Sequence, residues 1–600
     1  MCGIAGFSGK NDKLAELISK SILHRGPDFS GVFCNENITL IHNLLAIRAV
    51  EDISKQPYKD NPEWVLVFNG QIYNTEKLKK NLQNLDKNKE SLDTYVLYKI
   101  IEKYGWEFYK YTHGMYAIAL YNRKQNILKL YRDQAGQKNI YWSFNGKKIV
   151  FASEIKAILE DSDINRDVDE DAIMISSKIG SLPGDKTIFK AIKKVRPGEI
   201  ITFDIKNLKV SKEFFKCDTA GFYSGNLESV FKNLLEEHIQ SKDRIAINLS
   251  GGIDSSILLH EIRNYGHEVD SYTTSFQLDK NISKNYNDDA LLAKRLSDHY
   301  KTKHTEILIT KKDYLNNFFD AYSAIEEPNY NISLPVYLIT AKHEGINGDK
   351  KRVVLKGDGG DELFGGYPHY LEVVKLQKKM KMFTPPIFNL LKNFRNHTNL
   401  NFNRAIERWF FYRKFKNGFA NSRDSEILKY LNDSSEYYLK FYNQKDKEPL
   451  PMMMLDRVLW MAGEFFIASD KLYMNQSMEV RSPLSYQPFR DYFDASLSNS
   501  DYINESSNKI ALRRYAEHRL PDFITKRKEK TGWRAPIEAW YDKECKEKFL
   551  EIISGLDSKN GLIDWDGLRK KIESSEKWPG KTTHIYLSLA SLAKKFKLNI

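Results

Sequence analysis

The first two hundred residues contain short runs of apolar and β-branched residues, separated by turns rich in Asn and Gly. Such runs predict β-strands, and the clearest lie at 64–74, 116–133, 138–153 and 199–204. Between the strands, residues 74–82 and 92–105 carry apolar side chains at helical spacing and predict amphipathic helices. We therefore expect the first part of the chain to be an α+β domain built on β-sheets.

The pattern changes after residues 207–226, which lose periodicity and collect Gly, Ser and Thr. An apolar, strand-like run at 244–250 is followed by a helical pattern, and strand and helix alternate again through 267–276 and 287–301. Strands that alternate with helices predict a doubly wound parallel sheet of the α/β class. From about Tyr367 onward the pattern is mostly helical.

Length supports this division, because 600 residues are too many for one hydrophobic core. We expect an α+β domain at 1–215 and an α/β domain with a helical C-terminal part at 225–600.

Composition limits the partners that the chain can have. The net charge of +13 is spread along the sequence and accompanies no nucleic-acid-binding motif, so we expect no nucleic-acid partner. The four cysteines are scattered, which favours a reducing compartment over a disulfide framework or structural zinc. No apolar run approaches the roughly 20 residues of a membrane helix, and the start lacks signal-peptide features. We expect a cytoplasmic protein that binds no membrane.

The segment Asn248 to Ser256 reads NLSGGIDSS and joins a predicted strand to a predicted helix. Glycines at such a junction let backbone N–H groups approach an anion, and a helix N-terminus favours negative charge. Asp254 adds a carboxylate suited to magnesium. The segment lacks the Lys-Ser/Thr of a phosphate-binding Walker A loop. By itself it also fits an ordinary glycine turn capped by Asp and Ser.

A second glycine-rich segment, 355–367 (LKGDGGDELFGGY), follows another strand-like run. It carries Asp358 and Asp361, with four glycines between positions 357 and 365. Glycines at this density indicate a backbone that approaches another group closely. The composition suits magnesium and pyrophosphate, and a solvated acidic loop is the alternative.

Together these two loops resemble the N-type ATP pyrophosphatases, in particular the synthetase domain of glutamine-dependent asparagine synthetases. Residues 469–484 (SDKLYMNQSMEVRSPL) and 509–540 (KIALRRYAEHRLPDFITKRKEKTGWRAPIEAW) are similar to two further segments of that family. The resemblance covers nearly the whole chain.

The start of the chain, MCGIAGFSGK, is similar to the class II glutamine amidotransferase domain of the same family, which begins Met-Cys-Gly-Ile. The segments RGPDFSG, NGQIYN and FASEIKA are further matches. The resemblance implies an Ntn-hydrolase sandwich of β-sheets flanked by helices. Removal of Met1 would leave Cys2 as the N-terminal nucleophile, with its own α-amine as general base. The Asn69 side chain and the Gly70 N–H would form the oxyanion hole.

Two positions depart from the family pattern at the glutamine-binding end of this domain. The arginine that clamps the glutamine carboxylate falls on Leu44, and the glutamate that binds the ammonium is Gln71, whereas the second ammonium ligand survives as Asp93. Arg48 lies about 13 Å beyond Leu44 if the strand continues at about 3.3 Å per residue. We therefore expect weak glutamine binding with ammonium as the better donor, unless Arg48 or Arg25 has taken over the clamp.

For the second domain, the resemblance implies a set of ATP and pyrophosphate contacts: Leu249, Ser250, Gly251, Gly252, Asp254, Ser255, Thr274, Gly357 and Asp358. Asp254 and Asp361 would hold Mg²⁺, and Lys530 would stabilise the transition state of adenylation. Lys356 replaces a serine of the family, and the sequence gives it no role.

The resemblance implies an ATP-dependent amidation of a carboxylic acid, most directly of aspartate to asparagine. An acyl-adenylate would be attacked by ammonia, supplied by glutamine hydrolysis at Cys2 or as free ammonium. Other acids stay open, such as a sugar uronate in surface polysaccharide synthesis or an intramolecular β-lactam closure, as does a protein with a degenerate glutaminase half. The expected partners are glutamine or ammonia, ATP and a small carboxylic acid, with a homodimer as one option.

Overall fold

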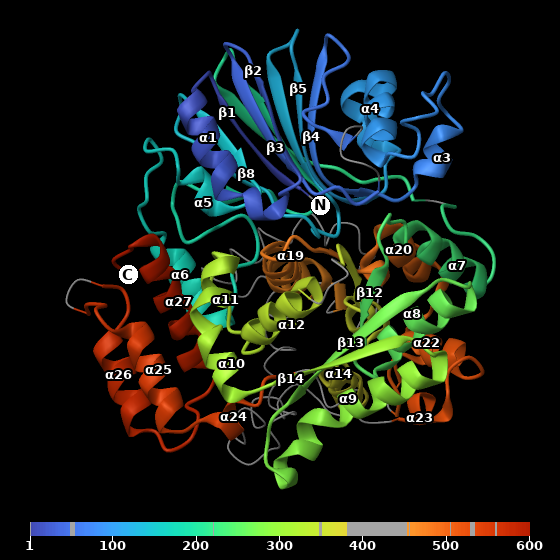
Figure 1. Cartoon of the computed structure of the whole chain (residues 1–600), viewed down its shortest axis with the longest axis vertical. Helices are drawn as coiled ribbons and strands as arrows, with labels where there is room; N and C mark the ends of the chain where they lie inside the picture. Colours follow the sequence, from blue (N-terminus) through green and yellow to red (C-terminus); the bar gives the residue numbers. More distant parts are fainter. Residues whose placement is uncertain are drawn as a thin grey trace.

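The fold is described from a computed structural model of the chain. It covers residues 2–48, 54–219, 221–346, 351–380, 453–454, 456–504, 506–527, 534–558 and 561–600. Figure 1 shows the two sheets of the first half stacked above the sheet and helices of the second half, with the N-terminus at their junction. Cys2, the expected catalytic cysteine, therefore lies at the boundary between the halves.

Two antiparallel sheets form the first half, as the sequence predicts. The first has the order β2-β3-β1-β8-β7-β9, with strands Phe29–Cys34, Ile38–Leu44, Gly3–Ser8, Ile149–Ala152, Tyr141–Phe144 and Lys193–Lys194. The second has the order β11-β10-β6-β5-β4, with strands Lys209–Phe214, Glu199–Asp204, Ile127–Arg132, Gly114–Asn122 and Trp64–Ile72. Buried side chains of both sheets, including Ile4, Val67 and Phe151, share one core. Helix α4 (Asp93–Tyr104) packs on the outer face of the second sheet.

Residues 207–226, where the sequence pattern loses its periodicity, begin with a strand that lies inside the expected first domain, 1–215. Residues Lys209–Phe214 form β11, which pairs in antiparallel register with β10 at the edge of its sheet. Most side chains of β11 are exposed, so the strand carries none of the apolar alternation by which strands are recognised.

A five-stranded parallel sheet organises the second half, again as predicted. Its order is β14-β13-β12-β15-β16, with strands Lys303–Ile309, Val269–Phe276, Ile245–Asn248, Val353–Leu355 and Glu479–Arg481. The chain starts at β12, runs to β13 and β14 on one side, and then continues through β15 and β16 on the other. The strand order therefore reverses between β12 and β15. Loops at the carboxyl ends of strands beside such a reversal form the usual ligand crevice of open α/β sheets.

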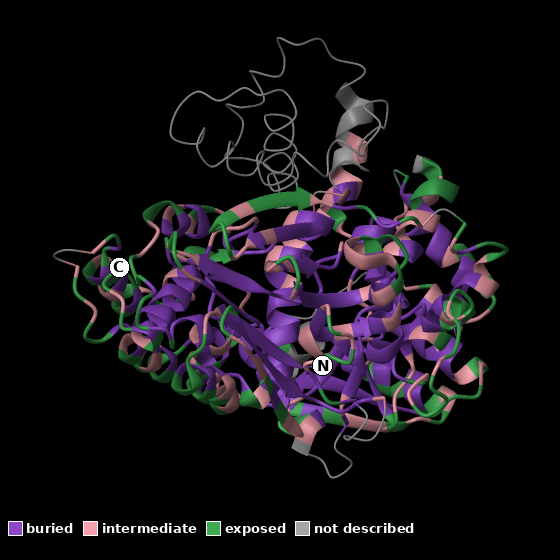
Figure 2. Cartoon of the chain, turned by 90° about the horizontal axis from the view of Figure 1, so that it is seen from above, coloured by how far each residue is buried: buried purple, intermediate pink, exposed green. Residues whose placement is uncertain are grey.

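Helices cover this sheet, and the most important for the site are α8 (Ile253–Asn264), α9 (Lys280–Tyr300), α12 (Leu334–Ile346) and α19 (Phe466–Met474). Figure 2 shows that buried residues run through the middle of the molecule, whereas exposed residues gather on the peripheral helices and loops. No helix among the described residues is long and apolar enough to cross a membrane.

The two halves are joined by apolar packing and by buried ion pairs. One hydrophobic cluster includes Ile18 and Ile155 of the first half together with Tyr322 and Leu472 of the second. At the same boundary the guanidinium of Arg25, fully buried, donates to Glu154 at 2.9 Å and to Asp470 at 2.8 Å. Asp470 lies on α19, so this bidentate arginine links the halves directly.

Lys194 and Glu327 form a second ion pair across the boundary, with both side chains almost fully buried. Glu326 precedes Glu327 in the chain and accepts a hydrogen bond from the backbone N–H of Ile155 at 2.7 Å. Its charge is balanced by Lys471 at 2.8 Å. Buried charges are tolerated only when paired in this way, so both halves are needed to complete the boundary.

We predict that Arg25→Met lowers the free energy of unfolding by about 3–5 kcal/mol, because it leaves Asp470 and Glu154 with one buried counter-charge fewer. The measurement is the urea midpoint followed by circular dichroism. Lys20→Met is the matched control, because Lys20 pairs with Glu16 in solvent and its loss should produce no measurable shift. An unchanged midpoint for Arg25→Met would show that the pair does not hold the boundary together.

Candidate active sites

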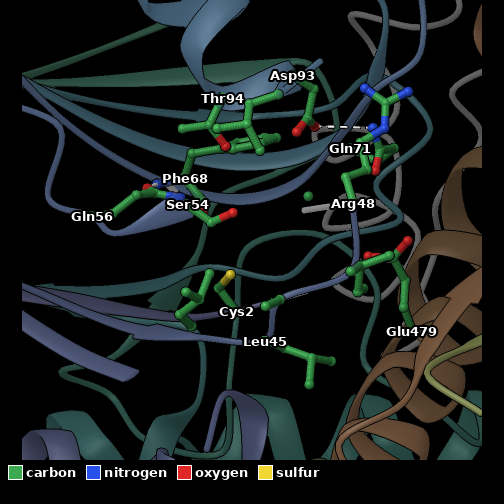
Figure 3. A pocket seen from close by; sticks show the side chains of 15 residues that line it. Cys2, Leu45, Arg48, Ser54, Gln56, Phe68, Gln71, Asp93, Thr94 and Glu479 are labelled. Carbon is green, nitrogen blue, oxygen red and sulfur yellow. Dashed lines mark hydrogen bonds between the residues drawn. The ribbon is translucent and has the colours of Figure 1, made fainter. Parts of the chain in front are cut away.

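A small cavity surrounds Cys2 at the boundary between the halves. Its walls come from the end of β3 and the residues after it, from β4, from the start of α4, and from β16 of the second half. The lining residues are Cys2, Leu44, Leu45, Ala46, Ile47, Arg48, Ser54, Gln56, Phe68, Gly70, Gln71, Leu92, Asp93, Thr94 and Glu479 (Figure 3). The cavity has a volume of about 40 Å³ and is partly open to solvent. This space is small for a glutamine molecule, so binding involves movement of lining side chains.

Cys2 and Asn69 meet as the resemblance implies. The backbone nitrogen of Cys2, which becomes the α-amine once Met1 is removed, donates to Asn69 Oδ1 at 2.9 Å. Asn69 Nδ2 is buried and has no hydrogen-bond partner among the described residues, so it can still donate to a developing oxyanion. Burial raises the pKa of the Cys2 thiol, which makes a nearby base necessary for thiolate formation.

Gly70 follows Asn69 on β4 with φ +155°, and a Cβ there would lie 2.1 Å from the Met115 carbonyl oxygen. The position therefore requires glycine.

Asp93 and Gln71 lie together on one side of the cavity, away from Cys2 (Figure 3). The Gln71 amide donates to Asp93 Oδ2 at 3.0 Å and accepts from Arg481 at 3.3 Å, while the Ile72 N–H also donates to Asp93 Oδ2 at 3.0 Å. Burial raises the pKa of Asp93, and the charge of Arg48 opposes that rise. Gln71 thus acts as a neutral bridge that orients the surviving carboxylate.

The position of Arg48 corrects the sequence-based estimate. Strand β3 ends at Leu44, and the following residues do not continue it, so the extrapolated separation of about 13 Å does not apply. Arg48 and Leu44 instead line the same cavity. Arg25, the other alternative clamp, is fully engaged with Glu154 and Asp470 and does not line the cavity.

Glu479 is contributed to the cavity by β16 of the second half, and sequence reasoning assigned it no role. Burial raises its pKa, but the positive chain terminus and Arg481 outweigh burial and bring the pKa to about 2. Arg481 donates to Glu479 at 2.5 Å and also to Gln71, so one arginine contacts both sides of the boundary. Glu479 belongs to the family-like segment 469–484, but only the fold brings β16 to this cavity.

The first glycine loop of the second half follows β12 at the reversal in strand order. Gly251 has φ +63°, and a Cβ there would lie 2.6 Å from the Leu292 Cβ on α9. Ser250 and Ser255 face each other across the loop, with their hydroxyl oxygens 3.1 Å apart. Gly252 is the N-cap of α8, whose first turn carries Asp254. Backbone and hydroxyl groups therefore surround the N-terminal end of a helix, where a phosphate is favoured.

The second glycine loop follows the adjacent strand β15 and touches the first. A Cβ on Gly357 would lie 3.1 Å from the Asp254 Cβ, and one on Gly360 would lie 2.4 Å from Asp254 Oδ1. Gly359 has φ +95° and packs against Ser485, whose hydroxyl donates to the Asp358 carbonyl at 2.9 Å. The glycines thus let two acidic loops lie side by side.

Lys509 lies between the two expected metal ligands. Its ammonium contacts Asp254 and is 2.7 Å from Asp361 Oδ1. Asp254 Oδ1 is buried and has no hydrogen-bond partner among the described residues, and carboxylate oxygens are preferred Mg²⁺ ligands. The pair therefore fits this ion when the Lys509 ammonium moves out of the space between them. Among the described residues, no three or more His, Cys, Asp or Glu side chains cluster as a metal site.

Lys530 lies outside the described residues, but Arg527, three positions earlier, donates to Asp289 at 2.5 Å and to the Gly251 carbonyl at 3.4 Å. Arg527 itself therefore reaches the first glycine loop. Sequence reasoning missed Arg527 and Lys509, although both belong to quoted family-like segments rich in basic residues.

The remaining predicted contacts lie near the same crevice. Leu249 donates its N–H to the Tyr272 carbonyl at 2.8 Å, and Thr274 lies two residues further along β13. Lys356, which the sequence left without a role, is buried between the Tyr337 and Tyr473 rings at 4.3 and 4.1 Å. Burial lowers its pKa to about 8 and raises that of Glu344 to about 8. Lys356 thus stabilises the aromatic wall beside the second loop.

Comparisons with known proteins find relatives for both halves of the chain. Residues 1–215 match the glutamine amidotransferase domain family, and residues 226–594 match the asparagine synthase family. Asparagine synthetase [glutamine-hydrolyzing] 1 of Bacillus subtilis is 26% identical over 92% of this chain and 90% of its own length. Putative asparagine synthetase [glutamine-hydrolyzing] 2 of Methanocaldococcus jannaschii is 30% identical over 62% of this chain and 76% of its own length. Asparagine synthetase B [glutamine-hydrolyzing] of Escherichia coli is 26% identical over 62% of this chain and 65% of its own length.

The family match covers most of the chain, and it agrees with the two-sheet half that holds Cys2 and with the paired glycine loops of the second half. The chain therefore belongs to the asparagine synthase family and is a carbon–nitrogen ligase that uses ATP and glutamine or ammonia.

Proposed function

We propose that this ligase converts aspartate to asparagine, with ammonia released from glutamine at Cys2 or taken up as free ammonium. The observation that carries the proposal is the meeting of the two acidic glycine loops at the reversal in strand order between β12 and β15. That crevice is where open α/β sheets bind their ligands. Its glycines, hydroxyls and carboxylates suit a nucleoside triphosphate.

At the first site, removal of Met1 exposes the α-amine of Cys2. An amine with a pKa near 8 takes the thiol proton at neutral pH, and the thiolate attacks the side-chain amide carbon of glutamine. The Asn69 Nδ2, buried and without a partner, donates to the oxyanion that forms. Collapse of the intermediate releases ammonia and leaves a thioester on Cys2, which water hydrolyses to glutamate.

At the second site, the aspartate β-carboxylate attacks the α-phosphate of ATP, which gives an acyl-adenylate and pyrophosphate. Ammonia then attacks the acyl carbon, AMP leaves, and one proton is released. Ser250, Ser255 and the loop N–H groups would hold the phosphates. Mg²⁺ between Asp254 and Asp361 would offset the charge on the phosphate oxygens. Glu479 of β16 lines the Cys2 cavity, so the second half adjoins the place where ammonia is released. This contact is an argument for delivery of ammonia across the boundary.

We predict that Asp254→Asn and Asp361→Asn each abolish ATP–pyrophosphate exchange, because each replaces a charged carboxylate ligand of the magnesium site with a neutral amide. Exchange of labelled pyrophosphate into ATP is the measurement, with a thermal melt to confirm folding. Asp298→Asn is the matched control, since Asp298 pairs with Lys294 on the exposed face of α9. Near-normal exchange in either site variant would exclude that residue as a metal ligand.

We predict that, with ammonium chloride as the nitrogen donor, the enzyme releases pyrophosphate from ATP faster with aspartate as the acceptor acid than with glutamate, succinate or glucuronate. The assay follows pyrophosphate and identifies the amide by mass spectrometry. Cys2→Ala serves as the control, because it should lose glutamine-dependent synthesis and keep the ammonium-dependent rate. Turnover of the uronate in place of aspartate would overturn the choice of acceptor while leaving the ligase chemistry in place.

A further inference from the structure

The glutamine cavity contains a cationic side chain at a position that the family pattern does not use. Arg48 lines this cavity together with Cys2, Asp93 and Leu44, the residue that replaces the expected arginine. Its Nη2 is buried and has no hydrogen-bond partner among the described residues. A buried guanidinium nitrogen without a partner is costly, and it is explained if a ligand completes its hydrogen bonds.

We propose that Arg48 binds the α-carboxylate of glutamine and so replaces the arginine lost at position 44. This inference rests on the proposed function only in taking glutamine as the nitrogen donor.

Charge complementarity fixes the orientation of the substrate. Arg48 and Asp93 are close enough for each charge to act on the other, and both lie on the side of the cavity away from Cys2 (Figure 3). A free amino acid carries one carboxylate and one ammonium on the same carbon. Binding places its carboxylate on the guanidinium and its ammonium on Asp93, which leaves the side-chain amide directed toward Cys2.

The hydrogen bonds around the cavity indicate which side chain makes room. Gln71 is held at both ends by Asp93 and Arg481, at 3.0 and 3.3 Å. Arg48 is a long side chain whose Nη2 has no partner to lose. Movement of the Arg48 Nη2 group therefore breaks no hydrogen bond among the described residues, whereas movement of Gln71 would break its bonds to Asp93 and Arg481.

The experiment compares two substrates of the Cys2 site in the full-length protein, without acceptor acid. One is glutamine, and the other is 4-aminobutanamide, which is glutamine without its α-carboxylate. Ammonia release gives kcat/KM for each. Arg48→Met is expected to lower kcat/KM for glutamine about 10- to 150-fold, mainly through KM, because it removes a charge-assisted hydrogen bond. Hydrolysis of 4-aminobutanamide should change less than about twofold, since that substrate never engages Arg48.

Arg166→Met is the matched control, because Arg166 is an exposed arginine of the same half that does not line the cavity. Equal losses on the two substrates, or no loss on glutamine, would overturn the assignment. If Arg48→Met does not fold, Arg48→Lys is measured in the same way. It keeps the charge without the bidentate fork, so a loss confined to glutamine supports the proposal and an equal loss contradicts it.

Ammonium-dependent synthesis by the same variants separates this proposal from the proposed function. Arg48 lies in the glutaminase half, so the ammonium-dependent rate should equal that of the unmodified protein. Absence of aspartate amidation in every variant and in the parent would contradict the proposed function alone, because the two-substrate assay measures hydrolysis at Cys2 and needs no acceptor.

Discussion

Buried charges of the first half are paired with buried charges of the second half. Arg25 reaches from the first half to Asp470, and Lys194 reaches to Glu327, with all four side chains almost fully removed from water. Such charges are tolerated only when each finds its partner. The pairs therefore fix one register between the halves, and that register brings Glu479 of β16 into the cavity of Cys2.

The elements with apolar periodicity could be predicted from the sequence, and the relations between distant segments could not. Strand β4 was found because it is a short apolar, β-branched run that ends at a turn, and helix α4 because its apolar side chains recur at helical spacing. Strand β11 was missed because its side chains are mostly exposed. Family-like motifs located Cys2, Asn69 and the two acidic loops, but the strand order that joins those loops exists only in the folded sheet.

The glutamine site shows why substitutions should be considered in three dimensions. In the sequence, Leu44 and Gln71 remove one cation and one anion, which suggested weak glutamine binding. In the fold, β3 stops at Leu44, so Arg48 returns to the same cavity, and Gln71 orients Asp93. The loss of a residue type at one position is therefore not the loss of its charge from the site.

Because the two halves are joined and Glu479 of the second half lines the Cys2 cavity, we expect nitrogen released at Cys2 to reach the second site within the protein. The measurement supplies glutamine labelled with ¹⁵N at the amide together with unlabelled ammonium, and follows the label in the amide product. The ¹⁵N fraction of the product should stay well above that of the free ammonium pool throughout the reaction. A product whose label always equals the pool would contradict this expectation, because ammonia would then pass through solvent between two independent sites.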